Sequence, residues 1–155
     1  MTPPRLSLAA MLIATFTLIA PPVFADDCTR LCDPDFIRDA TAQDIQAEID
    51  KGADIEARDK DGATPLHFAA LWDNAEAITV LLQAGANIDA RDKGGATPLH
   101  EAANGGNAEA VTALLRAGAN GKARTIENKT PFDLAKDNDQ LIGTDAYWLL
   151  NEAQH

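Results

Sequence analysis

Apolar residues recur along the chain at helical spacing, in short segments separated by turn-forming residues. Ile78, Leu81 and Leu82 lie three and four residues apart, which places them on one face of a helix. Equivalent stripes are formed by Ile45 and Ile49, by Val111, Leu114 and Leu115, and by Ala146, Leu149 and Leu150. The pattern predicts helices over about 42–51, 75–84 and 144–153, with a further helix around Leu114.

A second, shorter helix precedes each central stripe. Thr64 can cap this helix, and Pro65 at its first position loses no hydrogen bond, so a helix is expected over about 65–72. Asn74 can cap the following helix, and Gly85 is suited to the left-handed position that ends it. The same signals return one unit later, at Thr97, Pro98, Asn107 and Gly118.

These signals belong to a 33-residue unit that keeps its register. A Thr-Pro-Leu-His run at 64–67 returns at 97–100 and, as Thr-Pro-Phe-Asp, at 130–133. With the Ala-Gly-Ala-Asn-Ile-Asp-Ala run at 84–90, this unit resembles the ankyrin repeat. The resemblance implies an all-α solenoid of helix pairs with hairpin fingers, built of about four units.

The register divides the chain into four units after residue 25. Residues 28–60 form an N-terminal cap repeat, 61–93 and 94–126 form full repeats, and 127–155 form a C-terminal cap repeat. In the first unit Glu48 replaces the apolar Leu81 of the second, as expected for a face open to solvent. The last unit has two extra residues before its final helix, and Tyr147 and Trp148 are interpreted as core filling there.

Residues 1–25 have the pattern of a secretory signal peptide. A single charge, Arg5, precedes an apolar run from Leu8 to Ala20, and small residues follow it. A membrane anchor is the alternative, but the run is too short to span a bilayer comfortably. Cleavage is expected after Ala25, which leaves a mature domain over 26–155. The expected location is periplasmic or secreted, as in the small exported bacterial ankyrin proteins that the chain resembles.

The formal net charge is −11, and it becomes −12 once Arg5 leaves with the signal peptide. An acidic balance argues against binding nucleic acid or an anionic membrane, because both need basic surfaces. Solubility alone explains the charge, and a basic partner stays open. A monomer without membrane contact after cleavage is expected.

The two cysteines, Cys28 and Cys32, follow the leader directly. Residues four apart on a helix lie about 6 Å from each other, within reach of a disulfide, and an exported chain meets an oxidising compartment. A Cys28–Cys32 disulfide is therefore expected. A redox site is disfavoured because the spacing is C-x-x-x-C rather than C-x-x-C.

The sequence contains no set of residues that is typical of a catalytic, metal-binding or cofactor-binding site, so the protein is not expected to be an enzyme. The segment after residue 25 contains no serine, and no glycine-rich phosphate loop is present. His67 and His100 occupy equivalent places in neighbouring units. The resemblance implies that they hydrogen-bond backbone between units, as structural residues. The predicted structural residues are Thr64, Pro65, His67, Thr97, Pro98 and His100.

Trp72 is the residue that the scaffold explains least, because Gly105 stands in its place one unit later. It is either part of a binding surface or packed beneath the neighbouring finger. By the same register the predicted partner-binding residues are Lys60, Asp61, Ala63, Leu71, Trp72, Lys93, Gly94, Glu101 and Asn104. The expected function is an exported protein-binding module acting through its concave face and fingers. The alternative is an inhibitor or immunity protein for a secreted enzyme or toxin.

Overall fold

The computed structural model describes residues 30–155, and those residues form helices and loops without a strand. A 3-10 turn, η1, spans Arg30–Cys32. The helices are α1 (Pro34–Asp39), α2 (Ala42–Asp50), α3 (Pro65–Leu71), α4 (Ala75–Gln83), α5 (Pro98–Gly105), α6 (Ala108–Arg116), α7 (Pro131–Ala135) and α8 (Asp145–Ala153). The predicted helices over 42–51, 65–72, 75–84 and 144–153 match these bounds to within one residue.

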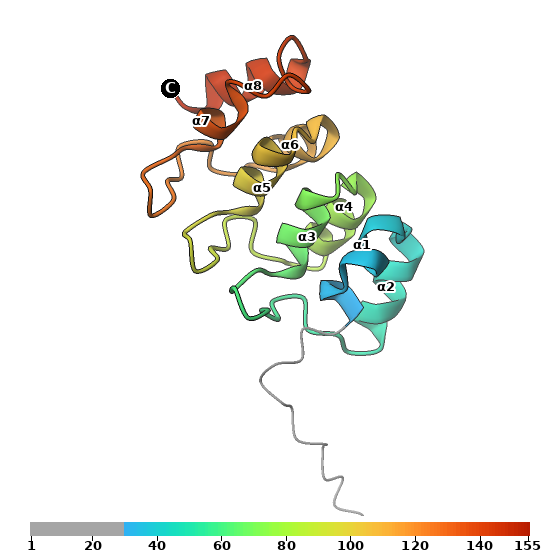
Figure 1. The fold of residues 1–155 in the computed structure, drawn as a ribbon. Coiled ribbons are helices and arrows are strands. Elements are labelled where there is room, and N and C mark those ends of the chain that lie inside the picture. Colours follow the sequence, from blue (N-terminus) through green and yellow to red (C-terminus); the bar gives the residue numbers. More distant parts are fainter. Residues whose placement is uncertain (1–29) are drawn as a thin grey trace, which may run out of the picture.

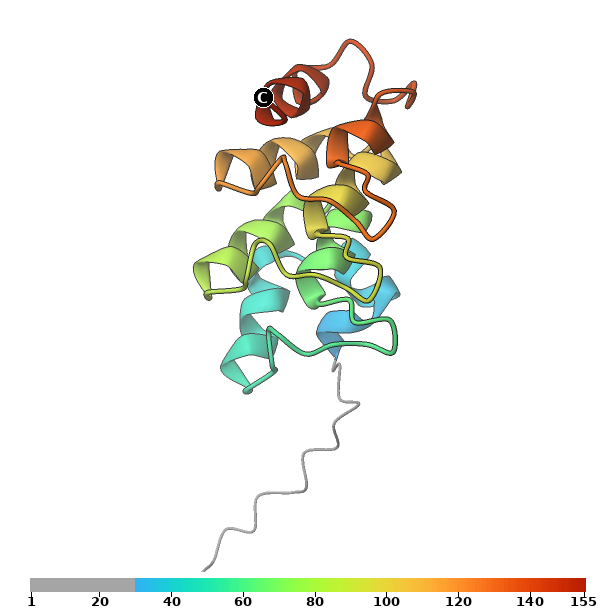
Figure 2. The ribbon, with the colours of Figure 1, turned by 90° about the vertical axis from the view of Figure 1, so that its left-hand side faces the viewer.

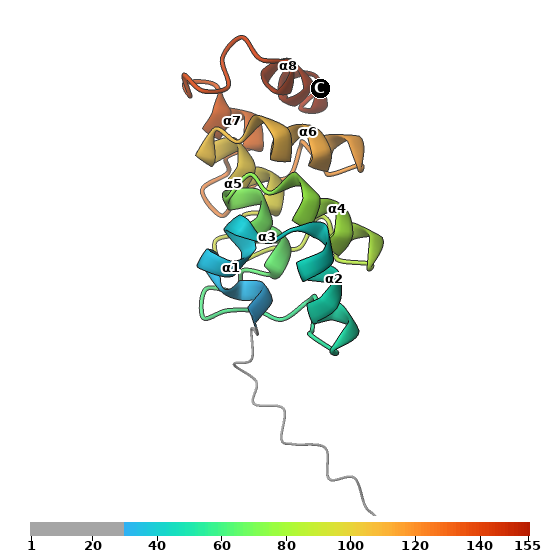
Figure 3. The ribbon, with the colours of Figure 1, turned by 90° about the vertical axis from the view of Figure 1, so that its right-hand side faces the viewer.

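The helices stack as four antiparallel pairs, from α1 and α2 at one end to α7 and α8 at the other (Figure 1). The first helices of the pairs contact one another in one layer, and the second helices contact one another in a second layer. The long connections between pairs lie on one side of the stack (Figure 2), and the short turns within pairs lie on the other (Figure 3). The predicted all-α solenoid is confirmed.

The core is a thin, continuous layer between the two rows of helices. Leu66, Ile78, Leu81, Leu99 and Leu114 are fully buried. Alanines separate these large side chains and let neighbouring helices approach closely; they are Ala69, Ala70, Ala77, Ala102, Ala103 and Ala110. The apolar stripes seen in the sequence are therefore the faces along which consecutive pairs pack.

The first unit departs from the 33-residue register at its start. Its first helix begins at Pro34, two residues later than the spacing from Pro65 requires, and Asp33 caps it by accepting from the Asp35 N–H at 3.0 Å. Glu48 does not simply face solvent. Its carboxylate bonds Lys51 at 2.9 Å and Arg30 at 3.4 Å, and these cations lower its pKa. Cys28 lies outside the described residues, as do 1–25, so the disulfide and the leader stay predictions.

The last unit differs more than the sequence indicated. The helix caps Asn107 and Thr144 are separated by four residues more than the 33-residue repeat, not two. In the longer connection between α7 and α8, Leu141 is fully buried and belongs to the core. The ring centroids of Tyr147 and Phe132 lie 5.3 Å apart, so these two rings pack together, but Trp148 is 57 % exposed. The interpretation of Trp148 as core filling is therefore wrong, because its position on α8 faces away from α6.

Leu114→Ala should lower the free energy of unfolding by about 2–5 kcal/mol, because it leaves a cavity between neighbouring repeats. Leu114 is fully buried, whereas Leu71 is 37 % exposed. The measurement is urea denaturation followed by circular dichroism. Leu71→Ala is the matched control and should cost less than about 1 kcal/mol. Equal losses in the two variants would contradict this account of the core.

Candidate functional site

Three hairpin fingers connect the helix pairs. They are finger 1 (residues 58–64), finger 2 (91–97) and finger 3 (124–130). Each is closed by a backbone hydrogen bond of 3.0 Å; the pairs are Asp59 N–H to Ala63 C=O, Asp92 N–H to Ala96 C=O and Thr125 N–H to Lys129 C=O. The Asp59 carboxylate also accepts from the backbone N–H groups of Asp61 and Ala63 at 2.9 and 2.8 Å. The turn residues of the sequence thus produce rigid tips.

An arginine at the base of finger 1 and another at the base of finger 2 tie each of these fingers to the next. The Arg58 Nη1 donates to the carbonyl of Arg91 at 2.7 Å, and the Arg91 Nη1 donates to the carbonyl of Arg124 at the same distance. Backbone hydrogen bonds also join the fingers: the Lys93 N–H donates to the Asp61 carbonyl, and the Ile126 N–H donates to the Gly94 carbonyl. The fingers therefore form one continuous surface.

Glycine is required where the fingers touch. Gly62 has a φ of +83°, and a Cβ built on it would lie 3.2 Å from the backbone nitrogen of Lys93. Gly95 repeats this arrangement against Ile126, with a φ of +74°. Asn128 takes the equivalent place in finger 3 with a φ of +64°, on a side where no further finger packs within the described residues. Asparagine tolerates this conformation better than most other non-glycine residues.

Each full repeat has one buried histidine, which bonds the repeat to the finger that follows it. The His67 Nδ1 accepts from the Thr64 N–H at 3.1 Å, so its proton sits on Nε2, which donates to the carbonyl of Ala96 at 3.2 Å. His100 makes the same contacts with Thr97 and with the carbonyl of Lys129. These are the bonds between units that the resemblance implied. Burial lowers the pKa of both imidazoles, so they stay neutral.

The structure brings five of the predicted partner-binding residues together on the fingers. They are Lys60, Asp61, Ala63, Lys93 and Gly94. The side chains of Lys60 and Asp61 are 87 % and 72 % exposed. The Lys93 Nζ donates to the carbonyl of Lys60, which joins the tips of fingers 1 and 2. The finger part of the predicted site is thus one contiguous surface.

Glu101 and Asn104 continue the predicted site along α5. Glu101 is partly buried and lies near Asp92, and both burial and that neighbouring charge raise its pKa. Asn104 is exposed, and its carbonyl accepts from the Asn138 side chain at 3.2 Å. Leu71, at the end of α3, is also exposed. The first helices of the pairs, α3 and α5, therefore present carboxyl, amide and apolar groups along their length, with Leu71 at the end of α3 farthest from finger 1.

Trp72 lies apart from this surface. It directly follows α3, whose seven residues hold it roughly 10 Å from finger 1. Its ring is 40 % exposed and lies 5.7 Å from the Arg38 guanidinium, at the turn between α1 and α2. The suggestion that Trp72 packs beneath a finger is wrong, because Trp72 lies at the opposite end of α3. Its role as a partner-binding residue stays a prediction, on a part of the surface that the length of α3 separates from the fingers. The 33-residue register shows which repeat contains Trp72, but it does not show how far Trp72 lies from the fingers.

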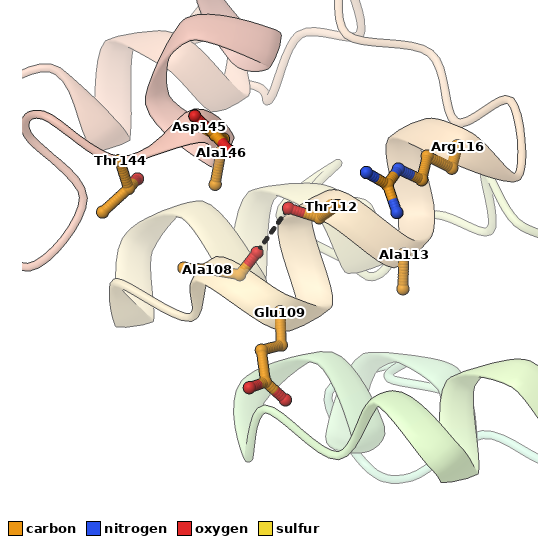
Figure 4. Close-up of a pocket in the computed structure, with 8 residues that line it drawn as sticks. All are labelled: Ala108, Glu109, Thr112, Ala113, Arg116, Thr144, Asp145 and Ala146. Carbon is orange, nitrogen blue, oxygen red and sulfur yellow. Dashed lines mark hydrogen bonds between the residues drawn. The ribbon is translucent and has the colours of Figure 1, made fainter.

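A groove on the outer side, between α6 and the start of α8, offers little specific chemistry (Figure 4). Its volume is about 340 Å³, and small side chains such as Ala108, Ala113 and Ala146 line it. The Thr112 hydroxyl there already donates to the Ala108 carbonyl at 2.8 Å. Over residues 30–155 no cluster of three or more metal-ligating side chains occurs, and no helix is long and apolar enough to cross a membrane.

The family model described as "Ankyrin repeats (3 copies)" matches residues 41–125 and 76–142. The chain belongs to the ankyrin-repeat family. Ankyrin repeats generally mediate protein–protein interaction and are typically non-enzymatic. No curated protein matches the chain closely enough to be counted as a relative.

Ile126 is an ankyrin finger residue that the sequence reasoning missed. It is 80 % exposed, the highest value among the large apolar side chains of residues 30–155. The signal was present in the 33-residue register, because Ile126 stands where the earlier fingers carry Lys60 and Lys93. An exposed isoleucine at a rigid tip is a further candidate for contact with a partner.

The two ankyrin histidines should make stability depend on pH. Their folded pKa lies below the unfolded value of 6.5, so the unfolded chain binds more protons in this range. Their contribution is complete above about pH 7 and declines as the pH falls from 6.5 toward the folded pKa. Urea midpoints between pH 7.5 and pH 5.5 test this. His67→Gln with His100→Gln should flatten the dependence, whereas the exposed control His155→Gln should leave it unchanged.

Proposed function

We propose that this ankyrin-repeat protein is a protein-binding module that acts through its fingers and the inner-helix face beside them. One observation carries the proposal. Positions that repeat every 33 residues, such as Thr64, Leu66 and His67, are buried. Other positions change between units and are exposed, as Leu71 and Ile126 are at 37 % and 80 %. The scaffold is therefore held by one set of side chains, which leaves a second set available for contact.

The chemistry of this second set favours a protein as the ligand. Lys60, Lys93 and Ile126 form a row of two cations and one apolar group on rigid tips, and Glu101 and Leu71 lie on the adjoining helices. Such mixed surfaces are typical of transient protein interfaces, in which apolar anchors are ringed by polar groups. Rigid fingers also lower the entropic cost of binding, since little needs to be ordered.

An inhibitor or immunity role toward a secreted enzyme or toxin is the more specific form of this proposal. The strong acidity and the leader-like residues 1–25 support it. In this role, as in a simple adaptor, the chain itself performs no catalysis. The two roles differ in their effect on the partner, because an inhibitor abolishes an activity that the isolated partner shows.

A finger variant should lose the partner. Lys60→Ala, Lys93→Ala and Ile126→Ser together remove the row of exposed tips and should weaken capture from an exported-protein extract by about tenfold or more. The matched control carries Arg116→Ala, Lys136→Ala and Ile142→Ser, which removes two cations and one exposed isoleucine elsewhere. The control should capture the partner like the unmodified protein. Equal capture by both variants would contradict the finger surface, and assays of the captured protein alone and in complex would separate adaptor from inhibitor.

We propose further that the chain is exported, that it is cleaved after Ala25 and that Cys28 and Cys32 form a disulfide. Protein recovered from the exported fraction should begin at Asp26 by mass spectrometry. It should react with a maleimide only after reduction. Cys28→Ser, which opens the short loop, should lower the free energy of unfolding by at most about 2 kcal/mol. An intact N-terminus, or thiols that react without reductant, would count against this pathway.

A further inference from the structure

A groove lies at the turns that join the helices of the first two pairs. These turns are on the side of the stack shown in Figure 3, remote from the fingers. Its volume is about 370 Å³, and it spans the first three helix pairs. Trp72 lies in it beside the turn between α1 and α2, and Glu109 reaches it from α6. Figure 4 shows the Glu109 carboxylate directed away from α8 and toward the preceding repeat.

The charge of the groove is strongly unbalanced. Four carboxylates line it, from Asp39, Asp73, Glu76 and Glu109, against the single guanidinium of Arg38. Asp39 already pairs with Arg38 at 3.0 Å, and Asp35 adds a second contact at 3.3 Å. The cation is therefore neutralised within the chain, and the remaining carboxylates give the groove a net negative charge.

The exposed indole shows which kind of group fits here. Arg38 places its guanidinium carbon 5.7 Å from the centre of the Trp72 ring, within the range of a cation–π contact. The chain thus already holds one cation on this ring, while 40 % of the residue stays open to solvent. The Glu109 carboxylate has no hydrogen bond or ion pair to another described residue, so its charge is available to a second cation.

We propose that this groove is a docking site for a basic segment of a protein partner. An arginine or lysine of that segment packs against Trp72, and Glu109 and Glu76 face its charge. Charge complementarity carries the choice of occupant, since the groove and the whole chain are acidic. The inference rests on the proposed protein-binding function, but it uses a surface separate from the fingers.

The test is fluorescence anisotropy of the full domain with a short fluorescein-labelled peptide of alternating arginine and glycine. A peptide with glutamate in place of arginine is the ligand control. The arginine peptide should bind saturably, and Trp72→Leu should weaken it by about threefold to fivefold, as expected for an exposed cation–π contact. Glu109→Gln should weaken it by about threefold. Asp137→Asn, which removes an exposed carboxylate outside the groove, is the matched control and should bind like the unmodified protein.

A second readout places the peptide at the groove. The chain has two tryptophans, so Trp148→Phe leaves Trp72 as the only one, and its emission should change over the same peptide concentrations. Equal weakening by Asp137→Asn and Glu109→Gln would show unspecific charge attraction and overturn the proposal. No binding, binding of the glutamate peptide, or concentration-dependent self-association through Trp72 would also overturn it.

The finger variant Lys60→Ala, Lys93→Ala, Ile126→Ser separates this inference from the proposed function. It should bind the arginine peptide like the unmodified protein, because the fingers lie at the far end of α3. If the peptide fails to bind while the fingers still capture a partner, the groove is excluded and the module remains. If the peptide binds and the fingers capture nothing, the finger surface is excluded instead.

Discussion

No helix pair of this chain can bury its apolar side by itself, so every pair depends on its neighbours. Ile78 and Leu81 of α4 are fully buried only because α2 and α6 lie on either side of that helix. Hydrogen bonds then fix how the pairs sit. The Asn74 side chain donates to the carbonyls of Ile37 and Ala40 at one end, and Arg58 donates to the carbonyl of Arg91 at the other. Consecutive pairs are therefore joined on the turn side, on the finger side and through the core between them.

This dependence explains why the inner part of the fold can be read from the sequence. Caps, glycine turns and apolar stripes act over a few residues, and the repeat copies them in register. Thr64 predicts a helix start, and the resemblance to ankyrin repeats adds the bond between units, which the structure places between His67 and the carbonyl of Ala96. Local chemistry and neighbour contacts point to the same structure in these units.

The end units could not be predicted in the same way, because a neighbour is missing on one side. Asp33 replaces the usual threonine cap, and Arg30 reaches Glu48 across the first unit. Leu141 lies in a connection without helical period, yet it is fully buried and belongs to the core. Trp148 was expected in the core by its apolar character, but its position on α8 is exposed. Each of these outcomes is decided by packing between segments, which a repeat register does not contain.

The residues of the candidate site also could be placed only in part from the repeat register. The register placed Lys60 and Lys93 correctly at adjoining tips, but it joined Trp72 to them although α3 lies between. The two surfaces also differ in charge. Lys60, Lys93 and Ile126 stand at the tips together with the exposed carboxylate of Asp61, whereas carboxylates outnumber the single cation around the indole at the opposite side. In the proposed interaction, a partner that touches both surfaces meets an acidic groove at Trp72 and mixed charges at the fingers. The difference in charge between the two surfaces would then favour one orientation of the partner over its reverse.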